Sequence, residues 1–166
     1  GWNEIIAMNK TGYWPSTPAT NLLYGLSEAC DMLLGEGLPA VFERHRRWSA
    51  AAQAAVRAWG LPIQCADDAL CSPILTGVIM PEGVDADAVR KVIYERFDCS
   101  LGTGLGKIKG RMFRIGHLGD CNDLTLLAAI AGCEMGLRVS DVSLQASGVQ
   151  AAMEYFQSNP IPALKA

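Results

Sequence analysis

The chain has 166 residues, the size of one ordinary domain or of one large part of a longer protein. Its 14 Lys and Arg and 17 Asp and Glu residues give a net charge of −3, without the clustered positive charge of a nucleic-acid-binding surface. Half of the residues are hydrophobic and 19% are charged, a composition that excludes a disordered chain.

The apolar stretches are far shorter than the roughly 20 residues that cross a bilayer, so we expect neither a nucleic-acid nor a membrane partner. The first 16 residues contain no initiator Met and no signal peptide. They also predict no regular element, and we expect the chain to begin within a longer protein. The six scattered cysteines form no C-x-x-C motif and indicate free thiols of a cytoplasmic protein.

Two helices are predicted in the first 60 residues. In the first, Ser16 or Thr17 supplies the cap, Pro18 lies in the first turn, apolar residues continue to Leu33, and Gly35–Gly37 ends the helix. The second runs from about residue 38 to residue 59 and is stopped by Gly60. Its inward-facing residues are predicted to be Val41, Phe42, Trp48, Ala52, Ala55, Val56 and Trp59.

Shorter elements follow. Residues 63–66 and 74–80 are predicted to be extended, Asp85 to cap a third helix, and residues 112–115 to form a short strand. Asn122 opens a fourth helix, and residues 149–156 form a last amphipathic piece. The predicted inner face of the fourth helix consists of Leu124, Leu127, Ala128, Ala131 and Met135.

This order predicts an α+β fold in which a small, mainly antiparallel sheet carries helices on one face and is preceded by long helices. We expect residues 1–60 to be the end of a large domain with inter-domain helices. Residues 61–166 are then a small C-terminal α+β domain.

The glycine-rich segment Gly102–Gly106 has the spacing G-x-G-x-G. A dinucleotide-binding loop needs G-x-G-x-x-G between a strand and a helix, and here a basic segment and a strand follow. The segment therefore indicates a loop near a site rather than a phosphate loop. Metal binding is not indicated either, because His117 and Cys121 lack further ligands and His45 lies in a charged helical segment.

Arg114 is the most informative single residue. It lies between Phe113 and Ile115 in an apolar strand, where an unpaired charge would be costly. A planar guanidinium suits a carboxylate held by two parallel hydrogen bonds. The partner is either the carboxylate of a ligand or an internal Asp or Glu.

Three segments together resemble class V pyridoxal-phosphate-dependent aminotransferases, with the serine–glyoxylate group most similar and the alanine–glyoxylate group next. They are GYWPSTPATNLLYGL at residues 12–26, SLGTGLG at residues 100–106 and FRIGHLGD at residues 113–120. The resemblance extends from about residue 10 to about residue 156.

The resemblance implies the C-terminal part of a fold-type I transferase that forms a homodimer, binds pyridoxal 5'-phosphate, and uses an amino acid and glyoxylate as substrates. It implies that Arg114 binds the substrate carboxylate. Tyr13 and Ser16, with Thr17, match positions that reach the cofactor phosphate of the partner subunit. In that family the segment at residues 102–106 lies near the site entrance.

One feature departs from the family pattern. None of the five lysines of this chain matches the family's Schiff-base lysine, so we assign no catalytic residue here. The expectation is a fragment of an enzyme that moves an amino group from serine or alanine to glyoxylate, and the fragment alone is expected to be inactive.

Two alternatives stay open. A free-standing domain that binds a small carboxylate explains the sheet and Arg114, but not the Ser-Thr-Pro segment. Another class V enzyme, such as a cysteine desulfurase, needs a reactive thiol, for which Cys99 is the candidate.

Overall fold

The computed structural model describes residues 1–161, and its residues group into two compact units, Gly1–Val41 and Phe42 onward. Six α-helices, two short 3-10 helices and three strands occur in these residues. Their bounds are α1 Trp2–Asn9, α2 Thr20–Glu36, α3 Leu38–Trp59, η1 Asp68–Leu70, β1 Leu75–Ile79, α4 Ala86–Phe97, β2 Gly102–Thr103, η2 Gly106–Ile108, β3 Met112–Gly116, α5 Asp123–Val139 and α6 Gly148–Ser158. None of the helices within residues 1–161 has the length and hydropathy of a membrane span.

The first unit contains two helices where one was predicted. α1 was not expected, and α2 begins at Thr20 with Ala19 at its cap rather than at Ser16 or Thr17. The segment before the helix instead turns at Pro18, whose carbonyl accepts a hydrogen bond from the Thr20 backbone N–H, and no side chain caps α2. The predicted end is confirmed, because Gly37 follows the last turn with φ 87°.

The second unit is built on the antiparallel sheet β1-β3-β2. Directly opposite residues share a face in such a pair, and the face alternates along each strand. Phe113 and Ile115 of β3 are completely buried and lie on one face with Val78 of β1. Arg114 lies between them in sequence and therefore belongs to the opposite face.

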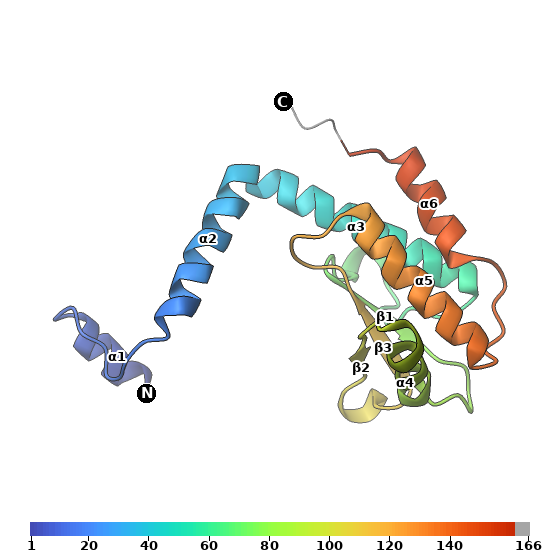
Figure 1. Cartoon of the computed structure of the whole chain (residues 1–166), viewed down its shortest axis with the longest axis horizontal. Helices are drawn as coiled ribbons and strands as arrows, with labels where there is room; N and C mark the ends of the chain where they lie inside the picture. Colours follow the sequence, from blue (N-terminus) through green and yellow to red (C-terminus); the bar gives the residue numbers. More distant parts are fainter. Residues whose placement is uncertain (162–166) are drawn as a thin grey trace. The chain divides into compact units, whose positions relative to one another are not determined.

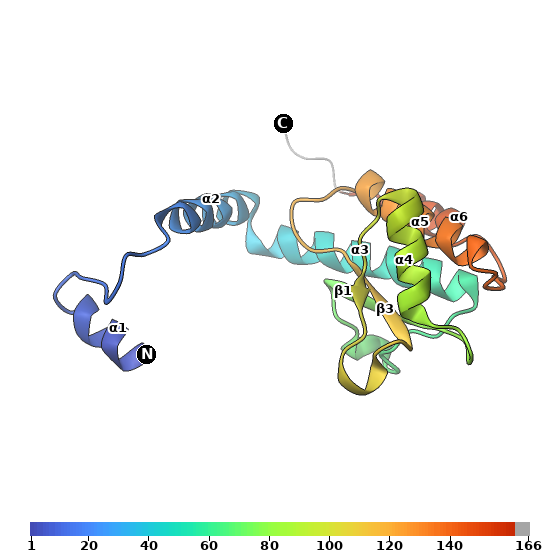
Figure 2. The same cartoon turned by 60° about the horizontal axis from the view of Figure 1, so that its bottom comes forward.

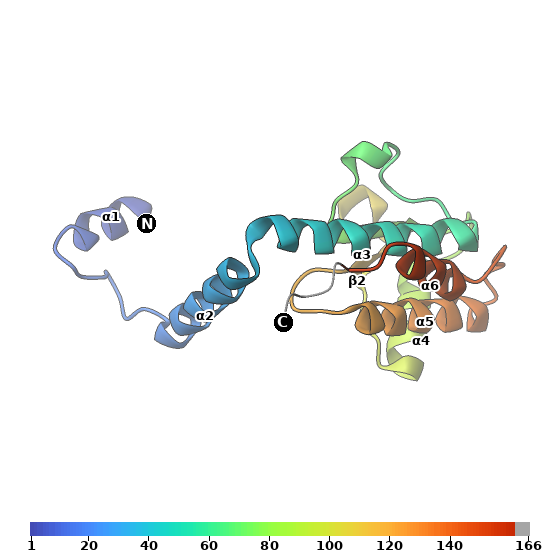
Figure 3. The same cartoon turned by 90° about the horizontal axis from the view of Figure 1, so that it is seen from above.

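Helices cover the Phe113 face of the sheet. α4 contacts β3 and β2, α5 packs against α4, and α6 packs against α5 (Figures 1 and 2). Viewed from above, α3, α6 and α5 lie side by side (Figure 3). The α+β architecture with helices on one face of a small antiparallel sheet is confirmed. The division at residue 60 into a large-domain end and a small domain stays a prediction.

Two predicted helix faces need correction. Phe42 of α3 is 53% exposed, whereas Trp48, Ala55 and Trp59 are buried as predicted. The core face of α5 is not the predicted one, since Leu124 is 74% and Met135 44% exposed. The residues of α5 that enter the core are Leu126, Ile130, Cys133 and Leu137. α5 is apolar around most of its circumference, so periodicity alone did not distinguish its faces.

Glu134 joins three helices. Its carboxylate, largely buried on α5, accepts hydrogen bonds from Trp59 Nε1 of α3 at 3.0 Å and from the Val149 backbone N–H of α6 at 3.1 Å. Burial raises its pKa, but these hydrogen bonds outweigh burial and hold the pKa below the ordinary value.

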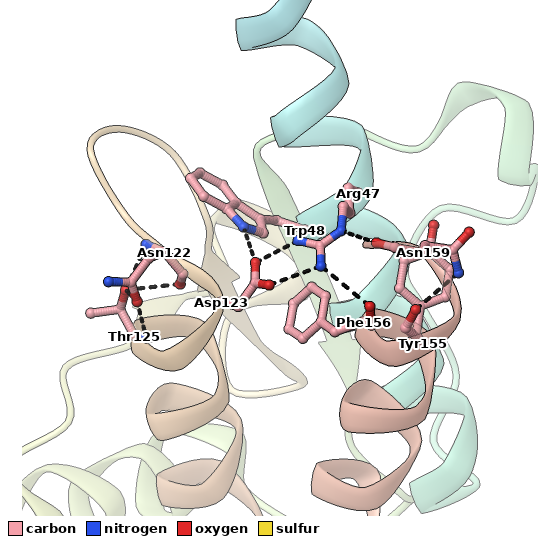
Figure 4. Close-up of polar contacts among 8 residues, drawn as sticks. All are labelled: Arg47, Trp48, Asn122, Asp123, Thr125, Tyr155, Phe156 and Asn159. Atoms are coloured by element: carbon pink, nitrogen blue, oxygen red, sulfur yellow. Dashed lines mark hydrogen bonds and ion pairs between the residues drawn. The ribbon is translucent and has the colours of Figure 1, made fainter. Parts of the chain in front are cut away.

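A second carboxylate fixes α3 to the start of α5. The Asp123 carboxylate accepts two hydrogen bonds from the guanidinium of Arg47, at 2.5 and 2.8 Å, and one from Trp48 Nε1 at 3.1 Å (Figure 4). Arg47 also donates to the backbone carbonyl of Asn159 beyond α6 (Figure 4). Burial raises the pKa of Asp123, but the hydrogen bonds from Arg47 and Trp48 lower it by more than burial raises it. The net shift of the pKa is therefore downward.

We predict that Asp123→Asn lowers the free energy of unfolding by about 2 kcal/mol at neutral pH, since it leaves the Arg47 charge without its partner. The folded-state pKa of Asp123 lies below 3.8, so the unfolded chain takes up the proton first as pH falls. The contribution is therefore fully present above the unfolded-state pKa of 3.8 and is lost progressively as pH falls through the lower folded-state pKa. Urea unfolding at neutral pH and along a series of pH values below 3.8 should show the stability difference between the two proteins shrinking as pH falls.

Glu43→Gln is the matched control, because Glu43 pairs with Arg46 on the surface, where both side chains are more than two-thirds exposed. It should change stability by less than about 1 kcal/mol. Equal effects of the two substitutions would contradict the structural importance of the Arg47–Asp123 pair.

Candidate functional site

Arg114 is the central residue of β3, and both of its cross-strand neighbours are glycines. Gly77 of β1 lies opposite it on one side and Gly102 of β2 on the other. The three residues form one row across the sheet, on the face that α4 does not cover. In this row only Arg114 has a side chain.

The glycines allow neighbouring side chains to pack closely against the strand backbone. A Cβ at Gly102 would lie 3.0 Å from Arg114 Nε and 3.1 Å from Arg114 Cβ. A Cβ at Gly77 would lie 2.6 Å from the Met112 side chain. Glycine in a strand interior weakens the strand and often marks a close approach, which these distances explain.

Within the described residues, the guanidinium of Arg114 makes no hydrogen bond or ion pair. Its Nε is buried and makes no hydrogen bond, and within residues 1–161 no Asp or Glu forms an ion pair with it. Arg47 and Arg90, in contrast, donate to carboxylates and to backbone carbonyls. A buried, unpaired donor on a charged group is costly, so the arrangement suits an anion supplied from outside the fold.

A pocket of about 330 Å³ opens beside Arg114. Gln53 of α3 and Ser72 contribute polar groups to its wall, and two thiols, Cys65 and Cys71, also line it. The apolar part of the wall consists of Ile63, Leu70, Leu75, Leu105, Ile108 and Met112. A mostly apolar pocket with one fixed cation is the form expected for a small carboxylate ligand.

The loops beside this pocket are anchored by His117. Its ring nitrogens pair with Thr76 Oγ1 at 2.9 Å and with the Pro73 carbonyl at 3.1 Å. Burial lowers the pKa of His117 to about 4, so the ring is neutral at physiological pH. His117 thus holds the segment after β3 against the segment before β1 without adding a charge.

The glycine-rich segment forms the turn between β2 and β3. Leu105 belongs to the pocket wall, and a Cβ at Gly104 would lie 2.3 Å from the Ile108 carbonyl oxygen. The segment leads into η2 and then β3 instead of a long helix, so it lacks the geometry of a dinucleotide loop.

Tyr13, Ser16 and Thr17 belong to the first unit. Ser16 and Thr17 line a pocket of about 460 Å³ before α2, whereas Tyr13 is 69% exposed and is not part of that wall. No side chain caps the first turn of α2. Ser16 and Thr17 thus bring two hydroxyls to one pocket, whereas the backbone N–H groups of Thr20 and Leu22 already donate to the carbonyls of Pro18 and Ala19.

The remaining candidates do not form sites. His117 uses both ring nitrogens as described, and Cys121 donates to the Leu118 carbonyl. Among residues 1–161 no three His, Cys, Asp or Glu side chains gather closely enough to hold a metal. Burial raises the pKa of Cys99, which is the opposite of what a reactive thiol requires.

Sequence reasoning singled out Arg114 but missed Gly77 and the two pocket thiols. An isolated glycine in the strand-like run Leu75–Ile79 was the available signal for a close approach. The meeting of Cys65 and Cys71 with Arg114 had no sequence signal, because it depends on the pairing of β1 with β3.

The curated proteins most similar to this chain include several aminotransferases. No protein-family model matches the chain. It is 45% identical over 161 residues to a serine–glyoxylate aminotransferase of Methylorubrum extorquens, and the match covers 96% of this chain and 40% of that protein. A serine–glyoxylate aminotransferase of Arabidopsis thaliana is 42% identical over 158 residues, covering 94% of this chain and 39% of that protein.

A solved structure agrees with these relatives. The pyridoxamine–pyruvate aminotransferase of Mesorhizobium loti superposes with a TM-score of 0.83 at 32% identity, over 89% of this chain and 38% of that one. This chain therefore spans about 40% of the length of the relatives that it matches.

We predict that Gly102→Ala lowers the free energy of unfolding by about 1 kcal/mol, because its Cβ would press on Arg114 from the adjacent strand. Gly116→Ala is the matched control, since a Cβ there meets nothing within 4 Å. Both substitutions reduce the entropy of the unfolded chain similarly, so their difference isolates the contact with Arg114. Urea unfolding measures it, and equal stability of the two variants would contradict the close approach.

Proposed function

We propose that the chain is the substrate-binding C-terminal part of a serine–glyoxylate type aminotransferase. The proposal starts from its membership of the aminotransferase family that includes the serine–glyoxylate enzymes. The whole enzyme would move an amino group from serine or alanine to glyoxylate. The observation that carries the proposal is the guanidinium of Arg114, which lies beside a pocket and has no acceptor of its own.

Arg114 binds the carboxylate that the amino donor and glyoxylate have in common. Its planar guanidinium can donate two parallel hydrogen bonds to a carboxylate, and the bound anion neutralises the charge. Gly77 and Gly102 flank Arg114, and the absence of a side chain at Gly102 lets the Arg114 side chain lie close to the β2 backbone. Fixing the carboxylate at one point orients the reacting carbon, and orientation of this kind contributes several kcal/mol to a rate.

Pyridoxal 5'-phosphate is the cofactor of the proposed whole enzyme. When bound, it supplies an electron sink for bond breaking at the α-carbon of the amino acid. In a homodimer, Ser16 and Thr17, together with Tyr13, would donate hydrogen bonds to the phosphate of the partner subunit's cofactor. The two hydroxyls in one pocket support this assignment.

No catalytic proton transfer is assigned to this chain. None of its five lysines lies in the family's context for covalent attachment of the cofactor, so the residues that exchange protons belong to another part of the proposed enzyme. The chain alone should accordingly bind a carboxylate without transferring an amino group. All six cysteines are free thiols, and we propose a cytoplasmic location on that basis.

A free-standing carboxylate-binding domain is the second candidate. It is favoured by one observation, namely that the pocket of Arg114 is formed entirely by residues of the second compact unit. The two candidates differ in whether the bound acid takes part in amino transfer. A cysteine desulfurase is not supported, because the thiol of Cys99 is half-buried and its pKa is raised.

In the proposed full-length enzyme, we predict that Arg114→Ala lowers kcat/KM for serine and for glyoxylate about 100-fold, the effect of losing a charge-assisted pair of hydrogen bonds. Arg114→Lys should recover only part of this loss, because an ammonium group cannot donate in the same planar arrangement. Steady-state kinetics of both half-reactions measures the change.

Arg111→Ala serves as the control, because Arg111 is an exposed arginine three residues earlier in the chain. It should leave kcat/KM unchanged, and thermal unfolding checks that each variant is folded. Wild-type kinetics in Arg114→Ala would refute the carboxylate role. Carboxylate binding by a wild-type protein that shows no amino transfer in any full-length context would favour the binding domain.

A further inference from the structure

The side chain of Arg114 lies along β2. A Cβ at Gly102 would lie 3.0 Å from Arg114 Nε, 3.1 Å from Arg114 Cβ and 3.4 Å from Arg114 Cζ, so the arginine side chain runs past the backbone of Gly102. A Cβ at Gly77, on the other side, would meet Met112 and Gln64 instead. Of the two flanking glycines, only Gly102 lies directly against the arginine side chain. The position of β2 therefore limits where the guanidinium can lie.

β2 has few backbone hydrogen bonds to hold it in that position. It consists of Gly102 and Thr103, it is an edge strand of the sheet, and within residues 1–161 it pairs with β3 alone. Segments with few protected backbone hydrogen bonds open locally at a lower free energy than the core of a fold. Contacts from outside the sheet therefore decide how firmly β2 is held against Arg114.

Two residues of α4 supply such contacts. Thr103 Oγ1 donates to Asp87 Oδ1 at 2.7 Å, and Arg90 Nη1 donates to the same oxygen at 2.8 Å. Arg90 also donates from Nε at 2.9 Å and from Nη2 at 2.7 Å to the carbonyl of Leu101, directly before β2. The hydrogen bonds from Thr103 and Arg90 lower the pKa of Asp87, so its carboxylate is an ionised acceptor at neutral pH.

The alternation of β2 connects these contacts to Arg114. Gly102 pairs with Arg114, whereas Thr103 pairs with Phe113 and belongs to the face that α4 covers. One residue of β2 is thus held by Asp87, and the residue before it lies against the arginine. Release of Thr103 would let Gly102 move away from Arg114.

We propose that Asp87 and Arg90 are positioning residues for the substrate carboxylate, because they hold β2 against Arg114 through Thr103 and Leu101. Neither residue touches the substrate in this arrangement. A guanidinium held in one orientation loses less freedom when it binds its anion, so the carboxylate binds more tightly. The inference rests on the carboxylate role of Arg114 proposed above.

The first experiment measures the ligand-free, ¹⁵N-labelled chain by NMR. Thr103→Val removes the hydroxyl that donates to Asp87 and keeps a β-branched side chain of similar shape. We expect the buried Nε–H group of Arg114 to exchange with solvent about tenfold faster in this variant, since local opening of β2 exposes it. Arg90→Met, which removes both hydrogen bonds to Leu101, should act in the same direction. Thr103→Ser keeps the hydroxyl and should retain the wild-type rate.

Thr125→Val is the matched control. It removes a hydroxyl that accepts from the Asn122 backbone N–H and donates to the Asn122 carbonyl in the first turn of α5. It should lower the stability of the fold and leave the exchange of the Arg114 Nε–H group unchanged. A wild-type exchange rate in Thr103→Val or in Arg90→Met would overturn the proposal. An equal acceleration in Thr125→Val would overturn it too, because the effect would then be a general loss of stability.

The second experiment measures the dissociation constant of glyoxylate by isothermal titration calorimetry. We expect it to rise about fivefold in Thr103→Val, because the guanidinium is no longer held in one orientation, and to stay at the wild-type value in Thr103→Ser and Thr125→Val.

Arg114→Ala separates this inference from the proposed function. Equal affinity of Arg114→Ala and the wild type for glyoxylate would refute the carboxylate role and the inference that rests on it. Loss of binding in Arg114→Ala together with wild-type affinity in Thr103→Val would overturn the positioning role alone and leave the proposed function intact.

Discussion

The guanidinium of Arg114 has to find its anion outside the fold, and the site depends on this constraint. Burying a charged donor without an acceptor costs more than an ordinary unmade hydrogen bond. The chain has acidic groups that could have supplied an acceptor, and it uses them elsewhere, at Arg47 and Arg90. The buried Nε of Arg114 without an acceptor therefore lowers the stability of the free protein, and a ligand carboxylate can supply the missing acceptor.

The packing of β3 holds Arg114 on its face of the sheet. Phe113 and Ile115 are completely buried on either side of Arg114, so β3 cannot turn over and bring Arg114 to its other face without exposing both. A slip by one residue would exchange the faces of the whole strand. The helices behind β3 are in turn joined by Glu134 and Asp123, whose carboxylates accept hydrogen bonds from α3. Arg114 is thus positioned by packing on the far side of the sheet.

Much of this fold could be predicted from local sequence. Asp85 and Asn122 begin their helices as predicted, because each accepts a backbone hydrogen bond in the first turn, and Gly60 follows α3 with φ 76°. These features depend on a few neighbouring residues. The fold class followed from the order of such elements, and the comparisons with known proteins support it.

The failures have physical causes in longer-range structure. The inner face of α5 was wrong because Leu124 and Leu126 are equally apolar, and only packing against α4 distinguishes them. The predicted cap of α2 was wrong because the chain turns at Pro18, whose carbonyl accepts from the Thr20 backbone N–H, so that the helix begins only at Thr20. Arg114 stood out as a charge in an apolar strand, whereas the importance of Gly77 became visible only through the pairing of β1 with β3.

The most direct measurement of the central claim is the NMR signal of the Arg114 Nε–H group in the ¹⁵N-labelled chain during titration with glyoxylate. The account predicts a saturable shift of this signal, with the Nε–H signal of the exposed Arg46 unmoved. An Arg114 signal that stays constant, or that moves only in parallel with Arg46, would contradict a carboxylate site at this side chain.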